Sequence, residues 1–246
     1  MEHDGIIYFF RKFQNMPNYF ALIPAAGHGT RMGAETPKQY LPLLGRPMIH
    51  HAIARLCSVP EIRWVYVVLA PNDEMWAQYD WHASSAKLRP LFCGGDTRAA
   101  SVLNGLLEIR SEVAAEDWVM VHDAARPCLM THHIAALMSE VGEDEVGGLL
   151  AVPVADTLKR SDERGRVRQT ESREGLWQTQ TPQMFRYGVL VNALQTIGTE
   201  APTDESRALE NLGLQPKLVA CDSRNLKVTY PQDLKLAELI LENLAD

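Results

Sequence analysis

The fold is decided by residues 24–41, which read Pro-Ala-Ala-Gly-His-Gly-Thr-Arg-Met-Gly-Ala-Glu-Thr-Pro-Lys-Gln-Tyr-Leu. They follow the apolar run Tyr-Phe-Ala-Leu-Ile at residues 19–23, which is typical of a buried strand. In open α/β sheets, ligands bind where the chain leaves the carboxyl end of such a strand. Small residues let a phosphate approach the backbone N–H groups closely, and Arg31 and Lys38 add two positive charges. The segment therefore predicts a polyphosphate-binding loop.

Two common phosphate-binding motifs do not fit this loop. The dinucleotide fingerprint Gly-x-Gly-x-x-Gly fails because Met32 stands where the third glycine should follow Gly27 and Gly29. No acidic residue ends a clear second strand about 20 residues further on, where the fingerprint expects one. The Gly-Lys-Ser/Thr ending of a P-loop is also absent. A nicotinamide-dependent oxidoreductase is therefore disfavoured.

Length and composition limit the class of protein. A chain of 246 residues with 46% hydrophobic and 22% charged residues suits one globular α/β domain. The net charge of −7 argues against a general nucleic-acid binder, which needs a basic surface. No apolar run reaches the roughly 18 residues of a membrane span. Four cysteines without Cys-x-x-Cys spacing argue against zinc and favour a reduced, cytoplasmic protein.

Two pairs of adjacent histidines, His50-His51 and His132-His133, are the other candidate metal ligands. Neighbouring residues of a helix point in different directions, so we expect neither pair to converge on a metal ion.

Strand-like and helix-like segments alternate along the chain. The strands are expected at residues 64–69, 88–93, 118–122, 148–153 and 216–221, and helices after 47, 98, 131, 187, 205 and 231. This alternation predicts a mostly parallel sheet with helices on both faces. We expect one domain at residues 18–246 and a disordered N-terminal extension at residues 1–17.

The alternation breaks at residues 155–177, which are polar and charged and show no helical stripe. A polar excursion of that length in a compact domain has a function or packs on a partner. We interpret it as a protruding β-hairpin arm used in dimerisation. The alternative is a disordered surface loop.

Two further clusters follow predicted strands. Asp123 comes directly after the strand at 118–122, where a carboxylate facing bound phosphates suits Mg²⁺, although a turn cap is an equal alternative. Gly95, Asp96 and Ser101 lie in or after a small-residue turn whose backbone suits the flat edge of a base.

Taken in order, seven motifs resemble the 2-C-methyl-D-erythritol 4-phosphate cytidylyltransferase family. They are Pro-Ala-Ala-Gly-x-Gly-x-Arg-Met (24–32), Pro-Lys-Gln-Tyr (37–40), Gly-Gly-Asp (94–96), Val-His-Asp-Ala-Ala-Arg-Pro (121–127), Thr-Pro-Gln (181–183), Thr-Asp-Glu (203–205) and Asn-x-Lys-Val-Thr (225–229). The resemblance covers about residues 20–241 and implies a Rossmann-like α/β fold and a cytoplasmic homodimer. Ala100 departs from the acidic residue that is common before the serine.

The resemblance implies a nucleotidyltransferase of isoprenoid biosynthesis. CTP and 2-C-methyl-D-erythritol 4-phosphate would give 4-diphosphocytidyl-2-C-methyl-D-erythritol and pyrophosphate, with Mg²⁺ on the triphosphate. The acceptor phosphate is itself the nucleophile, so no general base is needed. The resemblance implies that the catalytic residues are Arg31, Lys38, Arg173 and Lys227. The residues implied to bind the nucleotide are Ala25, Ala26, Gly27, Gly95, Asp96 and Ser101. The residues implied to bind the acceptor are Asp123, Thr157, Arg173, Thr181, Thr203 and Lys227. Thr157 and Arg173 lie on the arm and would serve the neighbouring subunit's site.

Two alternatives stay open. A ribitol-5-phosphate cytidylyltransferase would share the nucleotide loop and much of the fold. A catalytically silent nucleotide-binding protein would not need Arg31, Lys38 and Asp123 together.

Overall fold

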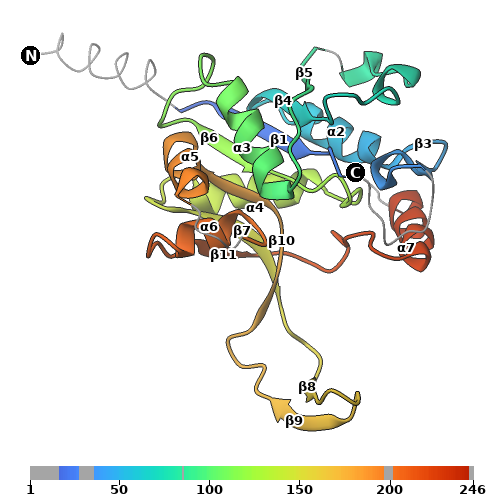
Figure 1. Cartoon of the computed structure of the whole chain (residues 1–246), viewed down its shortest axis with the longest axis vertical. Helices are drawn as coiled ribbons and strands as arrows, with labels where there is room; N and C mark the ends of the chain where they lie inside the picture. The colour runs from blue at the N-terminus through green and yellow to red at the C-terminus, as the bar shows by residue number, and fades with distance from the viewer. Residues whose placement is uncertain (1–16, 28–35, 85, 197–201, 244–246) are drawn as a thin grey trace, which may run out of the picture.

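A seven-stranded sheet forms the centre of the molecule (Figure 1). The computed structural model describes residues 17–27, 36–84, 86–196 and 202–243, so residues 1–16 of the expected extension lie outside it. From edge to edge the strands are β11 (Lys217–Ala220), β7 (Gly147–Pro153), β10 (Trp177–Arg186), β6 (Trp118–Val121), β1 (Tyr19–Pro24), β4 (Ile62–Val68) and β5 (Leu88–Leu91).

The sheet is mostly parallel, as predicted. Strand β1 pairs in parallel with β4 and β6, β4 with β5, and β11 with β7. Strand β10 runs antiparallel between β6 and β7 and was not predicted from the sequence. It lies between the two parallel parts of the sheet and thereby buries residues 180–185.

Helices cover both faces of the sheet, which confirms the predicted layers. Phe20 and Leu22 of β1 pack with the helices α3 (Arg98–Glu108), α5 (Tyr187–Gln195) and α6 (Glu205–Glu210). Ala21 and Ile23 point to the opposite face and pack with α2 (Met48–Ser58) and α4 (Thr131–Val141). This alternation along β1 is the period of two that a strand buried on both faces must show.

A smaller cluster holds the C-terminal helix α7 (Pro231–Glu242) against the body. Ala237 of α7 packs with Leu43 of β2 (Pro42–Leu43) and with Val228. Strand β2 pairs with β3 (Arg46–Pro47) immediately before α2. Because Val228 is buried in this cluster, the segment that carries Lys227 is fixed at its end. The remaining elements are the short 3-10 helices η2 (Lys38–Tyr40), η3 (Trp76–Gln78) and η4 (His82–Ser84).

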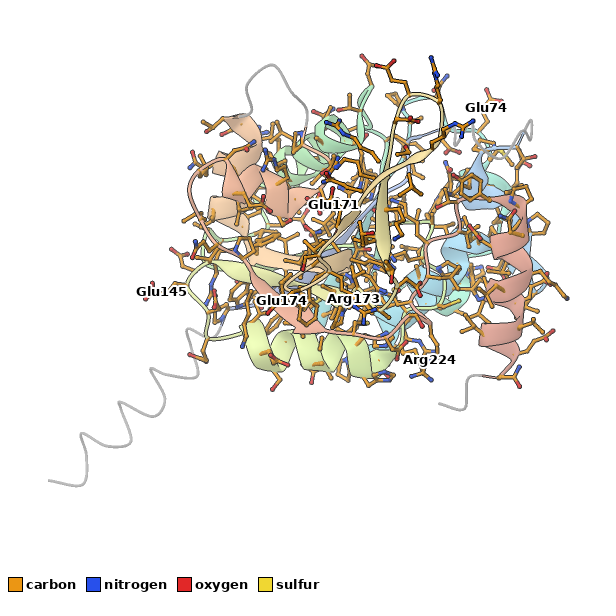
Figure 2. All side chains as sticks on the ribbon, turned by 90° about the horizontal axis from the view of Figure 1, so that it is seen from below. Glu74, Glu145, Glu171, Arg173, Glu174 and Arg224 are labelled. Atoms are coloured by element: carbon orange, nitrogen blue, oxygen red, sulfur yellow. The ribbon has the colours of Figure 1, made fainter. Side chains whose placement is uncertain are left out.

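The polar segment at residues 155–177 forms an arm that projects away from the sheet (Figure 1). Its strands β8 (Leu158–Ser161) and β9 (Val167–Glu171) pair antiparallel. Figure 2 labels Glu171, Arg173 and Glu174 along this segment, seen from the side of the arm. The predicted β-hairpin is therefore confirmed, and the alternative of a disordered loop is wrong.

None of the helices in the described part of the chain combines the length and apolar composition that a bilayer span requires.

Candidate active site

A cavity of about 670 Å³ opens where the parallel strands β1, β4, β5 and β6 end. Ligands of open α/β sheets bind at this edge, because the loops that leave the strands meet there. The cavity is lined by Pro24, Ala25, Ala26, Gly27, Lys38, Gln39, Met48, Ala70, Pro71, Asn72, Gly94, Gly95, Asp96, Thr97, Arg98, Ser101, Asp123, Ala124, Ala125 and Lys227. Its walls thus combine small residues with three cationic side chains among the described residues.

Most of the site residues expected from the sequence line this one cavity. They are Ala25, Ala26, Gly27, Lys38, Gly95, Asp96, Ser101, Asp123 and Lys227. Thr157 and Arg173 are exposed on the arm, Thr203 is exposed just before α6, and none of the three lines the cavity. Arg31 lies outside the described residues.

The turn at residues 94–96 forms one wall of the cavity and packs closely on the end of β1. A Cβ atom on Gly94 would lie 2.2 Å from the Cβ of Ala26 and 2.7 Å from the carbonyl oxygen of Leu69. The Ser101 hydroxyl accepts a hydrogen bond from the backbone N–H of Gly95 at 3.1 Å. Gly94 therefore allows residues 26 and 94 to form a flat, narrow wall, and Ser101 fixes the turn.

Lys38 reaches the cavity from η2, and the two residues that follow it hold η2 in place. The Gln39 side chain donates to the carbonyl oxygen of Ala25 at 2.6 Å. The Tyr40 hydroxyl donates to Asp73 at 2.8 Å, and its ring stacks on Tyr79 with 5.5 Å between centroids. Ala25 lines the cavity and Asp73 directly follows the lining residue Asn72, so the backbone of Lys38 is fixed relative to the cavity walls.

Asp123 is the centre of the charged end of the cavity. Its Oδ1 accepts from Arg98 Nε at 2.9 Å, its Oδ2 lies 2.7 Å from Lys227 Nζ, and Arg126 Nε is 4.0 Å away. Burial alone would raise the pKa of Asp123, but the charges of Arg98 and Lys227 overcome that effect and hold the pKa well below its usual range. The carboxylate is therefore ionised at neutral pH and orients two cations.

His122 and Thr181 support Asp123 from behind the cavity. Because the carbonyl oxygen of Arg126 can only accept, the His122 ring proton lies on Nε2 and donates to that oxygen at 3.1 Å. The Thr181 hydroxyl therefore donates to His122 Nδ1 at 3.1 Å, and it accepts from the backbone N–H of Asp123 at 3.0 Å. Burial lowers the pKa of His122 to about 4, which keeps the ring neutral. Thr181 thus lies beneath the cavity and is almost completely buried.

Sequence reasoning missed three residues of this end of the site, namely Arg98, Arg126 and Glu205. Arg98 lines the cavity and pairs with both Asp123 and Glu205. Arg126 donates to the backbone oxygens of Asn225 and Thr179. All three residues stand inside or next to the quoted motifs, but their partners are distant in sequence, so no local pattern marks them.

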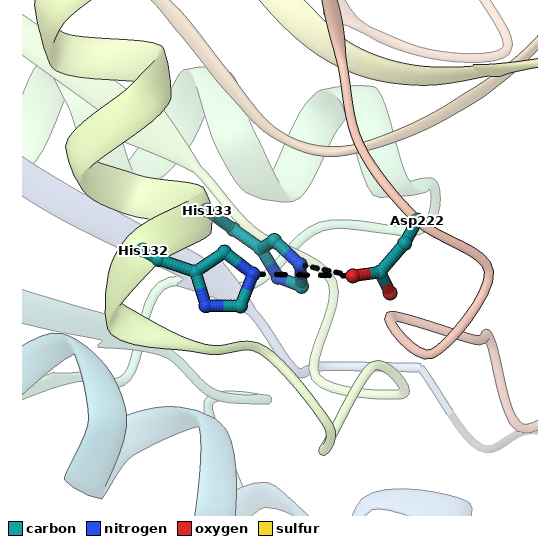
Figure 3. A group of neighbouring side chains, drawn as sticks. All are labelled: His132, His133 and Asp222. Carbon is teal, nitrogen blue, oxygen red and sulfur yellow. Dashed lines mark hydrogen bonds and ion pairs between the residues drawn. The ribbon is translucent and has the colours of Figure 1, made fainter.

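His132 and His133 come together on Asp222, outside the cavity (Figure 3). The expected divergence of the two side chains is wrong for this pair, because the Asp222 carboxylate lies beside the first turn of α4 and attracts both rings. Their Nε2 atoms lie 3.9 Å and 3.2 Å from Asp222 Oδ2. That the pair binds no metal ion stays a prediction.

Two members of this group, His133 and Asp222, are already hydrogen-bonded to other protein atoms, which disfavours a metal ion there. The Met130 N–H donates to His133 Nδ1 at 3.3 Å, so the ring proton lies on Nε2 and points at Asp222. Arg224 donates to the same carboxylate oxygen at 2.7 Å. A metal ion would have to displace both the proton and the guanidinium.

Comparison with known proteins identifies the family of this chain. The family model for 2-C-methyl-D-erythritol 4-phosphate cytidylyltransferase matches residues 19–243. A relative of that name from Nitrosospira multiformis is 64% identical over 230 residues, which cover 93% of this chain and 99% of the relative. Another from Azoarcus is 59% identical over 227 residues, covering 92% of this chain and 95% of the relative.

Solved structures agree with the sequence relatives. A 4-diphosphocytidyl-2C-methyl-D-erythritol synthase superposes with a TM-score of 0.80 at 38% identity, covering 92% of this chain and 99% of that one. The 2-C-methyl-D-erythritol 4-phosphate cytidylyltransferase of Thermus thermophilus superposes with a TM-score of 0.74 at 29% identity and the same coverage. The family model spans nearly the whole described chain, and the Nitrosospira relative is 64% identical to it over 93% of its length. This chain belongs to the 2-C-methyl-D-erythritol 4-phosphate cytidylyltransferase family.

Proposed function

We propose that this chain transfers the cytidylyl group of CTP to 2-C-methyl-D-erythritol 4-phosphate in the non-mevalonate isoprenoid pathway. An oxygen of the acceptor phosphate forms a bond to the α-phosphorus of CTP. The bond from that phosphorus to the bridging oxygen breaks, and pyrophosphate leaves with the electron pair. The observation that carries the proposal is the cavity in which Lys38 and Lys227 share one space with the small residues 25–27. Cations in such a cavity would offset the repulsion between the two phosphate anions that react.

The chemistry needs positioning and charge stabilisation more than proton transfer. The acceptor phosphate is anionic at neutral pH, so the nucleophile needs no base. Lys38, and Arg31 from the same loop, would stabilise the charge that grows on the α-phosphate and the leaving pyrophosphate. Lys227, oriented by Asp123, would hold the acceptor phosphate. The turn at Gly95, Asp96 and Ser101, with Ala25, Ala26 and Gly27, would bind the base and ribose.

We propose Mg²⁺ as the cofactor, bound mainly by the triphosphate of CTP. Both oxygens of Asp123 are paired with cations, Oδ1 with Arg98 and Oδ2 with Lys227. A metal ion on Asp123 would displace the Lys227 ammonium, so the described residues around Asp123 do not fit a preformed magnesium site. Bound Mg²⁺ would neutralise charge on the triphosphate. Loss of turnover in EDTA and its return with excess MgCl₂ would support the requirement for a divalent cation.

We propose a homodimer in which the arm reaches the neighbouring subunit. An isolated two-stranded hairpin is marginally stable in water, and this one exposes Val167 and Leu176. Thr157 and Arg173 would then complete the partner's site, since neither lines the cavity of their own subunit. A cytoplasmic location fits the four cysteines, which are unpaired.

Pyrophosphate release with CTP and MgCl₂ tests the function. Methylerythritol 4-phosphate and ribitol 5-phosphate are compared as acceptors, with Lys38→Ala and Arg31→Ala as controls. We expect turnover with methylerythritol 4-phosphate alone, reduced at least about 10²-fold in either variant. Turnover with ribitol phosphate would transfer the assignment to that acceptor. No release with either acceptor would support a silent nucleotide-binding protein.

A further inference from the structure

Glu205 is a buried carboxylate at the start of α6, and only 1% of the residue is exposed. Its two oxygens accept from Arg98 Nη1 at 2.6 Å and from Nη2 at 3.0 Å. Removing a carboxylate from water is costly unless a cation with good geometry compensates it. The paired, two-bond contact with Arg98 supplies that compensation, and it fixes the plane of the guanidinium.

The third donor of Arg98 continues the contact toward the cavity. Its Nε donates to Asp123 Oδ1 at 2.9 Å, while Lys227 Nζ lies 2.7 Å from Asp123 Oδ2. Four side chains of alternating charge therefore follow one another in the order Glu205, Arg98, Asp123 and Lys227. Burial by itself would lower the pKa of Arg98, but Glu205 and Asp123 raise it above its usual value.

Lys227, at the end of this series, is the side chain that most needs a contact to hold its position. The Lys227 side chain is 45% exposed and ends a flexible four-carbon stem, whereas the Asp123 side chain is only 10% exposed. Each contact in the series restricts the next: the guanidinium plane sets the direction of Nε, and Nε sets the rotation of the Asp123 carboxylate. That rotation decides where Oδ2 holds the ammonium group.

We propose that Glu205 and Arg98 are positioning residues for acceptor binding, acting on Lys227 through Asp123. The proposal rests on the proposed function of Lys227 as a ligand of the acceptor phosphate. Glu205 does not itself line the cavity, and it bonds the lining residue Arg98, so its effect on the reaction passes through Arg98. None of the four side chains is among the residues proposed to bind the base and ribose, so we expect the KM for CTP to stay unchanged.

A double-mutant cycle between Glu205 and Lys227 tests the proposal. We expect Glu205→Gln to lower kcat/KM for the acceptor roughly tenfold, within the range of coupled polar contacts, with the KM for CTP unchanged. Lys227→Met should lower it further. The double variant should then equal Lys227→Met within about twofold, because Glu205 has no route to the acceptor once Lys227 is absent.

A role in stability alone gives a different result. In that case the effects of Glu205→Gln and Lys227→Met on kcat/KM would multiply in the double variant. Alternatively, Glu205→Gln would lower the temperature of unfolding and leave kcat/KM unchanged. Either result would overturn the proposal. Glu210→Gln is the matched control, because Glu210 lies on the same helix, is exposed and pairs with Arg207. We expect it to change neither kinetic parameter.

Two further measurements separate the possible failures. An inactive wild-type enzyme would refute the proposed function itself, whereas an active wild-type enzyme with multiplying effects would refute only the positioning role. If Glu205→Gln fails to fold, Arg98→Lys takes its place in the cycle, since lysine keeps the charge but lacks the paired donors. We expect Arg98→Lys with Lys227→Met to equal Lys227→Met alone.

Discussion

Gly94 shows how strongly a single residue controls the shape of the cavity. An added methyl group would overlap the side chain of Ala26 and the carbonyl oxygen of Leu69, and neither is the end of a flexible side chain. Gly94→Ala should therefore push residue 26 outward, raise the KM for CTP and lower the free energy of unfolding by about 1–3 kcal/mol. Denaturant unfolding and CTP kinetics measure both effects.

The matched control is Gly27→Ala, where the added methyl group meets no described atom within 4 Å. We expect its unfolding free energy to stay within about 0.5 kcal/mol of the wild type. Equal stability of Gly94→Ala and Gly27→Ala would contradict the close packing of the turn against β1.

His122 predicts a pH dependence of stability. Its pKa is about 4 in the folded protein and near the ordinary 6.5 in the unfolded chain. Between these values the unfolded chain binds more protons, so the free energy of unfolding rises with pH in this window. The contribution is complete above about pH 6.5, is lost as the pH falls toward 4, and reaches roughly 3 kcal/mol.

Urea unfolding of the wild type and His122→Gln at pH 4.5, 5.5 and 7 checks this contribution. We expect the variant to have the shallower dependence on pH. His51 and His133, whose pKa values are also lowered by burial, contribute equally to both proteins and so cancel. Parallel curves for the two proteins would show that His122 is not the group responsible.

At the residue scale, the sequence identified the charged groups whose motifs lie in loops at strand ends. It did not identify the pair of Arg98 and Glu205, which are 107 residues apart. A charged residue on a helix is usually solvated, and only the packing of α6 against the sheet buries Glu205. The resemblance implies that Thr181 binds the acceptor. In the structure its hydroxyl forms hydrogen bonds with the backbone N–H of Asp123 and with the ring of His122.

At the scale of elements, the predicted strands and helices were found within a few residues, because their apolar residues recur with clear periods. Strand β10 was missed because residues 178–183 are polar apart from Pro182. In the structure the polar side chains of this strand form hydrogen bonds within the protein. The Gln183 side chain bonds Asp204 and the backbone N–H of Ser206, and the Gln180 side chain accepts from Asn225. A hydrophobic period cannot reveal a strand that is buried through hydrogen bonds.

The 3-10 helix η2 gives a prediction about catalysis. Tyr40→Phe removes the hydrogen bond to Asp73 that fixes the backbone next to Lys38. Asp73 keeps its bonds from the backbone of Met75 and Trp76, so the loop it lies in stays folded. We expect kcat to fall several-fold, with the KM for the acceptor nearly unchanged, because a preorganised cation acts chiefly in the transition state.

Steady-state kinetics with both substrates measures this effect, and Tyr79→Phe is its control. The Tyr79 hydroxyl makes only a 3.4 Å contact with the carbonyl oxygen of Tyr40, so its loss should leave kcat within about twofold. An unchanged kcat in Tyr40→Phe would mean that Gln39 alone fixes η2.

At the scale of the whole molecule, the arm is the feature that the single chain does not explain. It leaves the body between β7 and β10 and contributes no side chain to the cavity of its own subunit. Residues 155–177 carry six basic and five acidic side chains, a net charge of +1, although the whole chain carries a net charge of −7. An exposed arm that lacks the acidic excess of the rest of the chain suits contact with a second copy.

If the arm completes the partner's site, two inactive variants should restore activity when they share a dimer. Lys38→Ala disables the cavity of its own subunit, and Arg173→Ala disables the site of the neighbour. In a mixed dimer one site then carries both defects and the other carries none. Random exchange makes about half of the dimers mixed, so about a quarter of all sites should be wild type. Mixing after mild denaturation and refolding, followed by pyrophosphate release, should therefore regain up to about 25% of wild-type turnover. If each subunit instead used its own Arg173, every site in the mixture would carry one defect, and turnover would stay at the level of the separate variants.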